Sequence, residues 1–353
     1  MVFKKFLLLL WFAAHQSYCQ WWGLFEDEPW ISEDDIAAND KGMISMLNIP
    51  ESDTLPSCRW VVYFSAYQIA VVAPPKNMYT TMRKLIAEHD AKYSMESCTA
   101  RQTCCDVHLN NSITRGDNIK WVVIVRDPFD KVLSSYWNSF INPAIDSGYC
   151  NYQSKCTFNE WMSQIDYGFL GSDEVGPYNI HLRTQINVAG IGLYKAYDYV
   201  IRMGNEKDMD FLWNLLEYDG VTHSNPSTNS DIDIDNKIES FSLMNTAIML
   251  NHYYSDIVMW ERVTKGLPRT DLQSRVLDSF SKAELGDYYA VRLEGRLIKT
   301  HYNVAIYAIA GGCKRHLTFE QFTDVERLSS HSLRMSKHSP AVINSIPNCN
   351  NSY

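Results

Sequence analysis

The chain has 353 residues, of which 46% are hydrophobic and 21% are charged. This composition is ordinary for a globular protein and excludes a disordered or fibrous chain, while the length allows one large α/β domain or two smaller ones. Acidic residues outnumber basic ones by 41 to 32, a formal net charge of −9. A general nucleic-acid binder needs a broad basic surface, so we expect no nucleic-acid partner, although a local pocket for an anion remains compatible with this charge.

The N-terminus has the pattern of a secretory signal peptide. Two lysines are followed by the apolar stretch Phe6–Ala14, and Ser17 and Cys19 place small residues at the −3 and −1 positions of a cleavage site. A membrane-spanning helix needs about 20 apolar residues. We therefore expect residues 1–19 to be a cleavable signal and expect no stable membrane span. The alternative is a short buried N-terminal helix.

The cysteines indicate the same compartment. Nine occur in all, and eight remain once Cys19 is removed with the signal. An even number suits disulfide bonds in an oxidising lumen, although the spacing leaves their pairing open. A zinc site is the competing interpretation, but no C-x2-C pair occurs, so we expect no metal. Glycosylation sequons at Asn110 and Asn350 are typical of a secreted or lumenal glycoprotein.

Alternating strand and helix patterns follow an acidic lead-in segment at residues 20–57. Short apolar runs predict buried strands, and helical periodicity with Pro128 at a first helical position predicts helices. The expected strands are Val61–Phe64, Ile69–Ala73 and Trp121–Val125, and the expected helices are 80–89, 129–140 and 237–263.

These patterns predict the α/β class, with a central parallel sheet flanked by helices. We expect one domain over residues 58–310 and a C-terminal tail at 311–353. The polar stretch 222–236 is expected to be an exposed insertion. Tyrosines cluster between residues 288 and 307, and we interpret them as core rather than as a surface for an acceptor.

The segment after the expected strand Ile69–Ala73 has features of a phosphate-binding turn. A tight loop leads to a helix that opens at Thr80 and Thr81. Free backbone N–H groups and the helix dipole attract anions at such a helix start, and Lys76 adds a full positive charge. The loop is not a Walker A motif, because the glycines of that motif are absent. A surface lysine beside an N-cap threonine is the alternative.

A second turn of this kind follows Trp121–Val125. Arg126 stands at the C-terminal tip of that strand, where open α/β sheets bind ligands, and its planar guanidinium suits bidentate contact with phosphate. Ser134 lies about two turns into the next helix, within reach of the same group. A local salt bridge between Arg126 and Asp127 that caps the helix is the alternative.

Together the two turns resemble the cofactor motifs of the Golgi carbohydrate sulfotransferases, the type 2 sulfotransferase family. These enzymes transfer a sulfuryl group from 3′-phosphoadenosine 5′-phosphosulfate (PAPS). Residues 75–81, Pro-Lys-Asn-Met-Tyr-Thr-Thr, resemble the loop that binds the 5′-phosphosulfate, in a form close to that of nematode members. Residues 126–129, Arg-Asp-Pro-Phe, with Ser134 and Tyr136, resemble the motif for the 3′-phosphate. The resemblance spans roughly residues 58–260.

The resemblance implies a P-loop-like sulfotransferase fold, PAPS as the sulfuryl donor and no metal. It also implies the Golgi lumen or secretion, and a glycan acceptor on a glycoprotein, glycolipid or proteoglycan. It assigns cofactor contacts to six residues. These are Lys76, Asn77, Thr80, Thr81, Arg126 and Ser134.

Later segments resemble further elements of the family. Phe158–Trp161 resembles the segment after the second motif. Residues 181–185, His-Leu-Arg-Thr-Gln, resemble a His-x-x-Pro-Gln element, with Thr184 in place of the proline. Tyr197–Val200 resembles a Tyr-Asp-Phe-Ile strand.

Sulfuryl transfer needs an acceptor hydroxyl in line with sulfur, charge stabilisation on the leaving phosphate, and a base. Lys76 is the candidate for stabilising the leaving group. The candidate bases are His181, in the family-like element, and His108, ahead of the strand Trp121–Val125, with Glu160 and His301 as weaker candidates. A purely structural histidine is the alternative.

Two other classes of function stay open. A secreted, non-catalytic protein of this fold would bind glycans or a partner without turnover. A P-loop kinase is disfavoured by the missing glycine loop and by the compartment. Cofactor binding with turnover separates an enzyme from the first class, and nucleotide preference separates it from the second.

Overall fold

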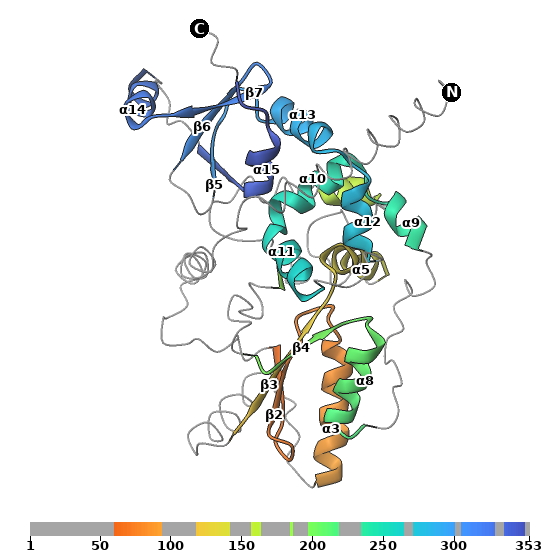
Figure 1. Ribbon diagram of the computed structural model, residues 1–353. Helices are drawn as coiled ribbons and strands as arrows, with labels where there is room; N and C mark the ends of the chain where they lie inside the picture. The colour runs from red at the N-terminus through yellow and green to blue at the C-terminus, as the bar shows by residue number, and fades with distance from the viewer. Residues whose placement is uncertain are drawn as a thin grey trace, which may run out of the picture.

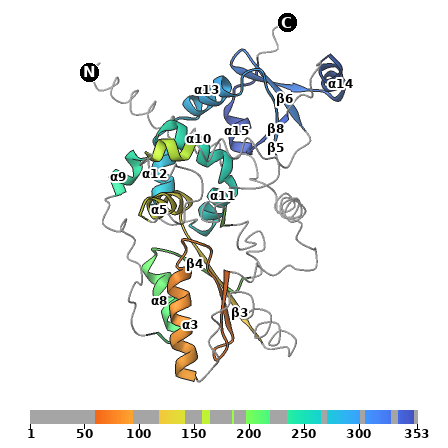
Figure 2. The same ribbon diagram turned by 180° about the vertical axis from the view of Figure 1, so that it is seen from behind.

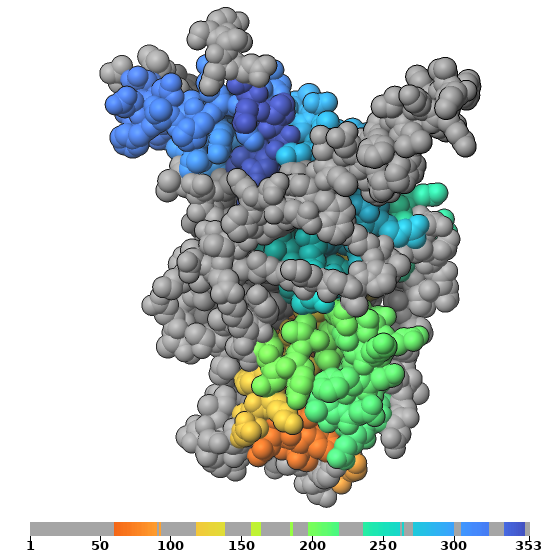
Figure 3. Space-filling view, in the orientation of Figure 1, coloured from red at the N-terminus to blue at the C-terminus, as the bar shows by residue number. Residues whose placement is uncertain are grey.

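The structure, a computed structural model, describes residues 60–93, 118–141, 157–163, 184–185, 197–218, 234–264, 271–300, 305–328 and 335–349. These residues form a mixed α/β fold with two four-stranded sheets. Figure 1 shows the first sheet and its helices at one end, the second sheet at the other, and a group of helices between them. The space-filling view shows the same separation, with the blue C-terminal part at the top and the orange to green part at the bottom (Figure 3).

The first sheet carries the two turns that the sequence singled out. Its strands are β1 (Val61–Phe64), β2 (Ile69–Val72), β3 (Lys120–Val125) and β4 (Tyr199–Arg202), in that spatial order. β2, β3 and β4 run parallel, whereas β1 runs antiparallel to β2. The sheet is therefore mixed rather than wholly parallel, because the short connection between β1 and β2 can join only antiparallel neighbours.

Both faces of this sheet are covered, which explains its continuous apolar strands. On one face, Val71 and Ile124 pack against Met82 of α3 (Tyr79–Tyr93) and Leu212 of α8 (Glu206–Leu215). The views from front and back both place these two helices side by side (Figures 1 and 2). On the other face, alternate residues of the same strands pack against Met259 and Trp260 of α11 (Tyr254–Val263).

The helix expected over residues 237–263 is wrong as a single element. The segment forms α9 (Ile234–Glu239), α10 (Leu243–His252) and α11 (Tyr254–Val263). Ser242 starts α10 as its N-cap, because its side chain accepts a hydrogen bond from the Asn245 N–H, and Tyr253 ends it. Tyr253 is buried in the same apolar cluster as Ile248 and Ile257, so the apolar pattern continues across the break and hides it.

That cluster also contains residues of α5 (Pro128–Ile141) and α12 (Leu272–Asp278). Phe129 and Val132 of α5 are fully buried there, so α5 is fixed against the central helices. Pro128 is the first residue of α5, as the sequence predicts. None of the helices in the described ranges combines the length and apolar composition that a membrane span requires.

The second sheet has the order β7-β6-β5-β8 and includes residues on both sides of the boundary expected after residue 310. β6 and β7 form a hairpin, whose turn places Gly311 and Gly312 at left-handed φ values of 62° and 75°. The strands of this sheet are β5 (Leu297–Thr300), β6 (Ile306–Ala310), β7 (Cys313–Leu317) and β8 (Met335–His338). The helices of the same part of the chain are α13 (Lys282–Arg292), α14 (Phe319–Leu328) and α15 (Pro340–Ser345).

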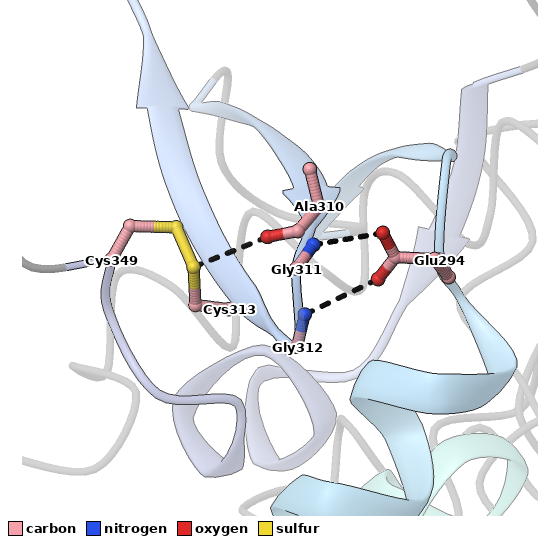
Figure 4. Close-up of a disulfide and its surroundings, with 6 residues drawn as sticks. All are labelled: Glu294, Ala310, Gly311, Gly312, Cys313 and Cys349. Carbon is pink, nitrogen blue, oxygen red and sulfur yellow. Dashed lines mark hydrogen bonds between the residues drawn. A yellow bond between two sulfur atoms is a disulfide. The ribbon is translucent and has the colours of Figure 1, made fainter.

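A disulfide between Cys313 and Cys349 ties the end of the described chain to β7, the edge strand of this sheet (Figure 4). Beside it, the carboxylate of Glu294 accepts hydrogen bonds from the backbone N–H groups of Gly311 and Gly312. The sequence left the pairing of the cysteines open, and the structure pairs Cys313 with Cys349. The other seven cysteines lie outside the described residues.

Candidate active site

The two turns lie side by side at the carboxyl ends of β2 and β3. Lys76 follows β2 by four residues and Arg126 follows β3 directly. The guanidinium of Arg126 donates from Nη1 to the backbone oxygen of Lys76, at 2.8 Å. The structure thus joins the two segments that the sequence proposed as one binding site, through a hydrogen bond between residues 50 positions apart.

The first turn has an unusual backbone. Lys76 and Met78 adopt left-handed φ values of 71° and 63°, which cost a non-glycine residue roughly 1–2 kcal/mol each. The side chain of Met78 packs against the apolar cluster under α3, and the ring of Tyr79 lies 4.9 Å from that of Trp60. Both bulky side chains are therefore engaged in packing.

Lys76 lies among other cations. Burial and the nearby charges of Arg126 and Lys131 lower the pKa of the Lys76 ammonium to about 7. Within the described part of the chain, no carboxylate lies within ion-pair distance of this ammonium. Lys131, which is fully buried in α5, likewise has its pKa lowered to about 8 by burial. An anion bound here would relieve the repulsion between these groups.

Arg126 is buried and held by Asp130 one helical turn later. Its Nε and Nη2 lie 2.7 and 2.6 Å from Asp130 Oδ2, and Lys237 of α9 reaches the other carboxylate oxygen at 3.1 Å. Burial opposes ionisation of Asp130, but the two cations outweigh it and lower the pKa of this carboxyl. The salt bridge considered between Arg126 and Asp127 is thus replaced by one to Asp130. Described residues engage three of the five guanidinium N–H groups.

Asp127 instead caps α5. Its Oδ1 accepts from the N–H groups of Phe129 and Asp130, at 2.8 and 3.3 Å, and its Oδ2 accepts from the N–H of Gln273 in α12, at 2.8 Å. Burial raises the pKa of Asp127 to about 7, although these hydrogen bonds favour the ionised form. This side chain fixes the second turn to a helix 146 residues away.

Replacing Asp127 with alanine is expected to lower the free energy of unfolding by about 2 kcal/mol or more, because the helix cap and the anchor to Gln273 are both lost. Asp127→Asn keeps the acceptor toward Phe129 and loses the one toward Gln273, so its loss should be roughly half as large. Urea denaturation of the purified protein measures both. Equal stability of wild type and Asp127→Ala would contradict the anchoring role.

Gln185 lies between the two turns. Its Oε1 accepts from the Arg126 N–H at 2.9 Å and from Asn77 Nδ2 at 2.5 Å, and its Nε2 donates to the Arg126 carbonyl at 2.8 Å. Its own N–H donates to Asp256 of α11, at 2.7 Å. Sequence reasoning assigned no role to Gln185, although its place in the family-like element at 181–185 was an available signal.

The other predicted contact residues are placed as follows. The Nδ2 of Asn77 also donates to the Ile124 carbonyl at 2.9 Å, so this amide connects the turns, while its buried Oδ1 has no hydrogen-bond partner among the described residues. Ser134 is buried in α5 and makes no hydrogen bond to another described residue. Thr80 and Thr81 lie in the first turn of α3, where Thr80 is exposed.

Of the candidate bases, Glu160 is the one that the structure describes. Its exposed carboxylate accepts hydrogen bonds from the Thr157 N–H and hydroxyl, and these bonds lower the pKa of Glu160. His181, His108 and His301 lie outside the described residues. Within the described ranges, no group of three His, Cys, Asp or Glu side chains is arranged to hold a metal ion.

The fold and this site define an α/β protein in which cationic side chains gather between two strand-to-helix turns. The sequence model of the sulfotransferase family matches residues 63–257, more than half of the chain, and the chain belongs to this family. No curated protein and no solved structure shows significant similarity to it. The matched span contains the end of β1, all of β2 to β4, both turns, Gln185 and Asp256, and the prediction of a sulfotransferase is confirmed.

Proposed function

We propose that this protein is a PAPS-dependent sulfotransferase that transfers a sulfuryl group to a hydroxyl of a glycan in the secretory pathway. One observation carries the proposal. Lys76 and Arg126, from two turns of a matched sulfotransferase domain, meet at one edge of the sheet, and no described carboxylate neutralises the Lys76 ammonium. Sulfotransferases generally use PAPS as donor, and PAPS carries phosphate at both ends.

The residues present fit such a donor. The left-handed backbone at Lys76 and Met78, followed directly by α3, is typical of loops whose N–H groups form an anion-binding nest. These N–H groups and Lys76 would hold the 5′-phosphosulfate. The two remaining N–H groups of Arg126, with the Ser134 hydroxyl, would hold the 3′-phosphate.

In the proposed mechanism, bound PAPS supplies the sulfuryl group and leaves as the 3′,5′-bisphosphate. Lys76 places its ammonium beside the leaving phosphate and stabilises the negative charge that develops there. Arg126 orients the nucleotide from its other end. His181 or His108 is the proposed base for the acceptor hydroxyl. Glu160 is a weaker candidate because its lowered pKa makes the carboxylate a poorer proton acceptor.

Compartment and acceptor class rest on other features. The disulfide between Cys313 and Cys349 supports an oxidising compartment, in agreement with the expected signal peptide at residues 1–19. The glycan acceptor rests on the resemblance of the two motifs to carbohydrate sulfotransferases. A Golgi-lumenal or secreted enzyme that acts on glycans accounts for the disulfide and for the resemblance of the two motifs.

The test is calorimetric titration of the purified protein with 3′-phosphoadenosine 5′-phosphate (PAP), with ATP as control, followed by a screen of glycan acceptors with PAPS. Micromolar binding of PAP, little binding of ATP and transfer to a glycan are expected. Binding without transfer to any acceptor would favour the non-catalytic alternative. No binding of PAP would overturn the proposal.

The affinity for PAP is expected to fall as the pH rises above about 7. The pKa of Lys76 is about 7 in the free protein, so its ammonium is largely protonated below that pH and increasingly neutral above it. Each pH unit should cost up to about tenfold in affinity. In Lys76→Arg the charge persists, so this component of the dependence should vanish, while titration of Lys131 remains in both proteins. Calorimetry between pH 7 and 9 measures the difference, and equal slopes would contradict the assignment.

A further inference from the structure

We infer that Gln185 is a positioning residue for sulfuryl transfer, which holds the Lys76 turn and the Arg126 turn in one fixed arrangement. This inference rests on the proposed function. It starts from the hydrogen bonds of a single carboxamide, which is fully buried and contacts both turns at once.

The carboxamide forms two hydrogen bonds with the backbone of Arg126. Its Oε1 accepts from the Arg126 N–H and its Nε2 donates to the Arg126 carbonyl, so the peptide plane on each side of this residue is fixed. The same Oε1 accepts from the amide of Asn77, which is the neighbour of Lys76. One side chain therefore sets the distance between the backbone of one turn and that of the other.

Gln185 is itself held from a third direction. Its backbone N–H donates to Asp256 of α11, a fully buried carboxylate whose charge acts on the ammonium of Lys131 in α5. The position of the carboxamide thus depends on the packed helices behind the sheet. A rigid support of this kind is what a precise placement of two binding groups requires.

The chemistry of the contacts favours glutamine over other residue types. The site needs an acceptor for two N–H groups and a donor for one carbonyl, all without charge. Glutamate supplies the acceptors and lacks the donor, whereas methionine has a similar length and supplies neither. A graded series of variants therefore separates hydrogen bonding from packing.

The consequence for catalysis follows from the place of Lys76. It adjoins Asn77, and its carbonyl accepts from the Arg126 guanidinium, so a shift between the turns moves the Lys76 ammonium relative to a nucleotide held by Arg126. A displacement of about 1 Å can cost about 10²-fold in rate. Binding of the nucleotide tolerates such a shift better than the transfer step does.

The first experiment measures kcat, KM for PAPS and PAP affinity of Gln185→Met in the full chain. We expect kcat to fall about 100-fold and PAP affinity to fall less than about tenfold. Gln185→Glu keeps the two acceptor bonds and should lose only about tenfold in kcat. If Gln185→Met does not fold, the kcat of Gln185→Glu tests the inference.

The matched control is Asn245→Leu. Asn245 is another fully buried carboxamide, and its Nδ2 donates to Asn159 at 2.5 Å and to the Ser240 carbonyl at 3.0 Å, in contacts made by neither turn. Asn245→Leu should lower the melting temperature about as much as Gln185→Met does, and it should leave kcat within about threefold of the wild-type value. If Gln185→Met behaves like this control, its role is structural and the inference is overturned.

A second readout needs no turnover. Double-mutant cycles on PAP affinity, with Lys76→Ala and Arg126→Ala, measure the coupling between the two turns. The coupling between the two substitutions should be several-fold smaller in Gln185→Met than with Gln185 present, and the direct hydrogen bond from Arg126 to the Lys76 carbonyl should retain the remainder. Unchanged coupling would contradict the inference. Failure of the wild type to bind PAP would instead overturn the proposed function, so the two failures are distinguishable.

Discussion

Sulfuryl transfer is expected to fall at least about 10²–10³-fold when Lys76 is replaced by alanine, because the positive charge beside the leaving phosphate is lost. The structure supports a large effect. The Lys76 ammonium has no described carboxylate partner, so its charge is available to the ligand. Initial rates with radiolabelled PAPS measure the loss, and near-normal turnover would contradict this role.

The backbone of Lys76 provides a control for this variant. At a φ of 71°, alanine keeps the strain of the left-handed conformation, whereas glycine relieves it. Lys76→Gly should therefore be more stable than Lys76→Ala by about 1 kcal/mol and equally inactive. Recovery of turnover in the glycine variant would show that backbone strain, and not charge, limits Lys76→Ala.

Replacing Arg126 with alanine should weaken PAP binding about 100-fold and binding of adenosine 5′-phosphate only a few-fold, because a bidentate contact to the 3′-phosphate is removed. The contrast between the two nucleotides matters more than either affinity. Loss of Arg126 also leaves Asp130 with Lys237 as its remaining partner in the described network, so some general weakening is expected. Calorimetric titration of both nucleotides tests the assignment.

Arg202 offers a matched control for Arg126. It is the last residue of β4 in the same sheet, and its side chain pairs with Asp208 through two hydrogen bonds of 2.6 and 2.8 Å. Arg202→Ala should leave the ratio of the two nucleotide affinities unchanged. Equal losses of both nucleotides in Arg126→Ala would show that Arg126 does not recognise the 3′-phosphate.

The parts of this site that were predictable are local in sequence. The strands before Lys76 and Arg126 are short apolar runs, and Pro128 marks the start of α5, so strand, turn and helix follow from neighbouring residues. The resemblance of the same two segments to family motifs then supplied their expected ligands. Both kinds of signal come from continuous stretches of chain.

The supporting contacts could not be predicted in this way. Gln185 reaches Arg126 across 59 residues, Asp256 reaches Gln185 across 71, and Gln273 reaches Asp127 across 146. Asp256 and Gln273 are polar residues placed by the packing of α11 and α12, so neither hydrophobic periodicity nor turn chemistry marks them. The one signal for Gln185 was its place in the family-like element at 181–185. The division of the stretch from 237 to 263 into three helices was missed for a related reason, since the apolar cluster runs on through Tyr253.

The anchor from α12 to the second turn has a consequence for how the protein can be divided. The family match ends at residue 257, whereas Gln273 donates to Asp127 from beyond that limit, and Ala247 of α10 packs in a cluster with Tyr289 and Val342. A protein cut at the limit of the match would keep every motif residue but lose these supports. The family match therefore does not delimit the folded unit, and substitutions after residue 257 are expected to weaken the support of the second turn without changing a motif residue.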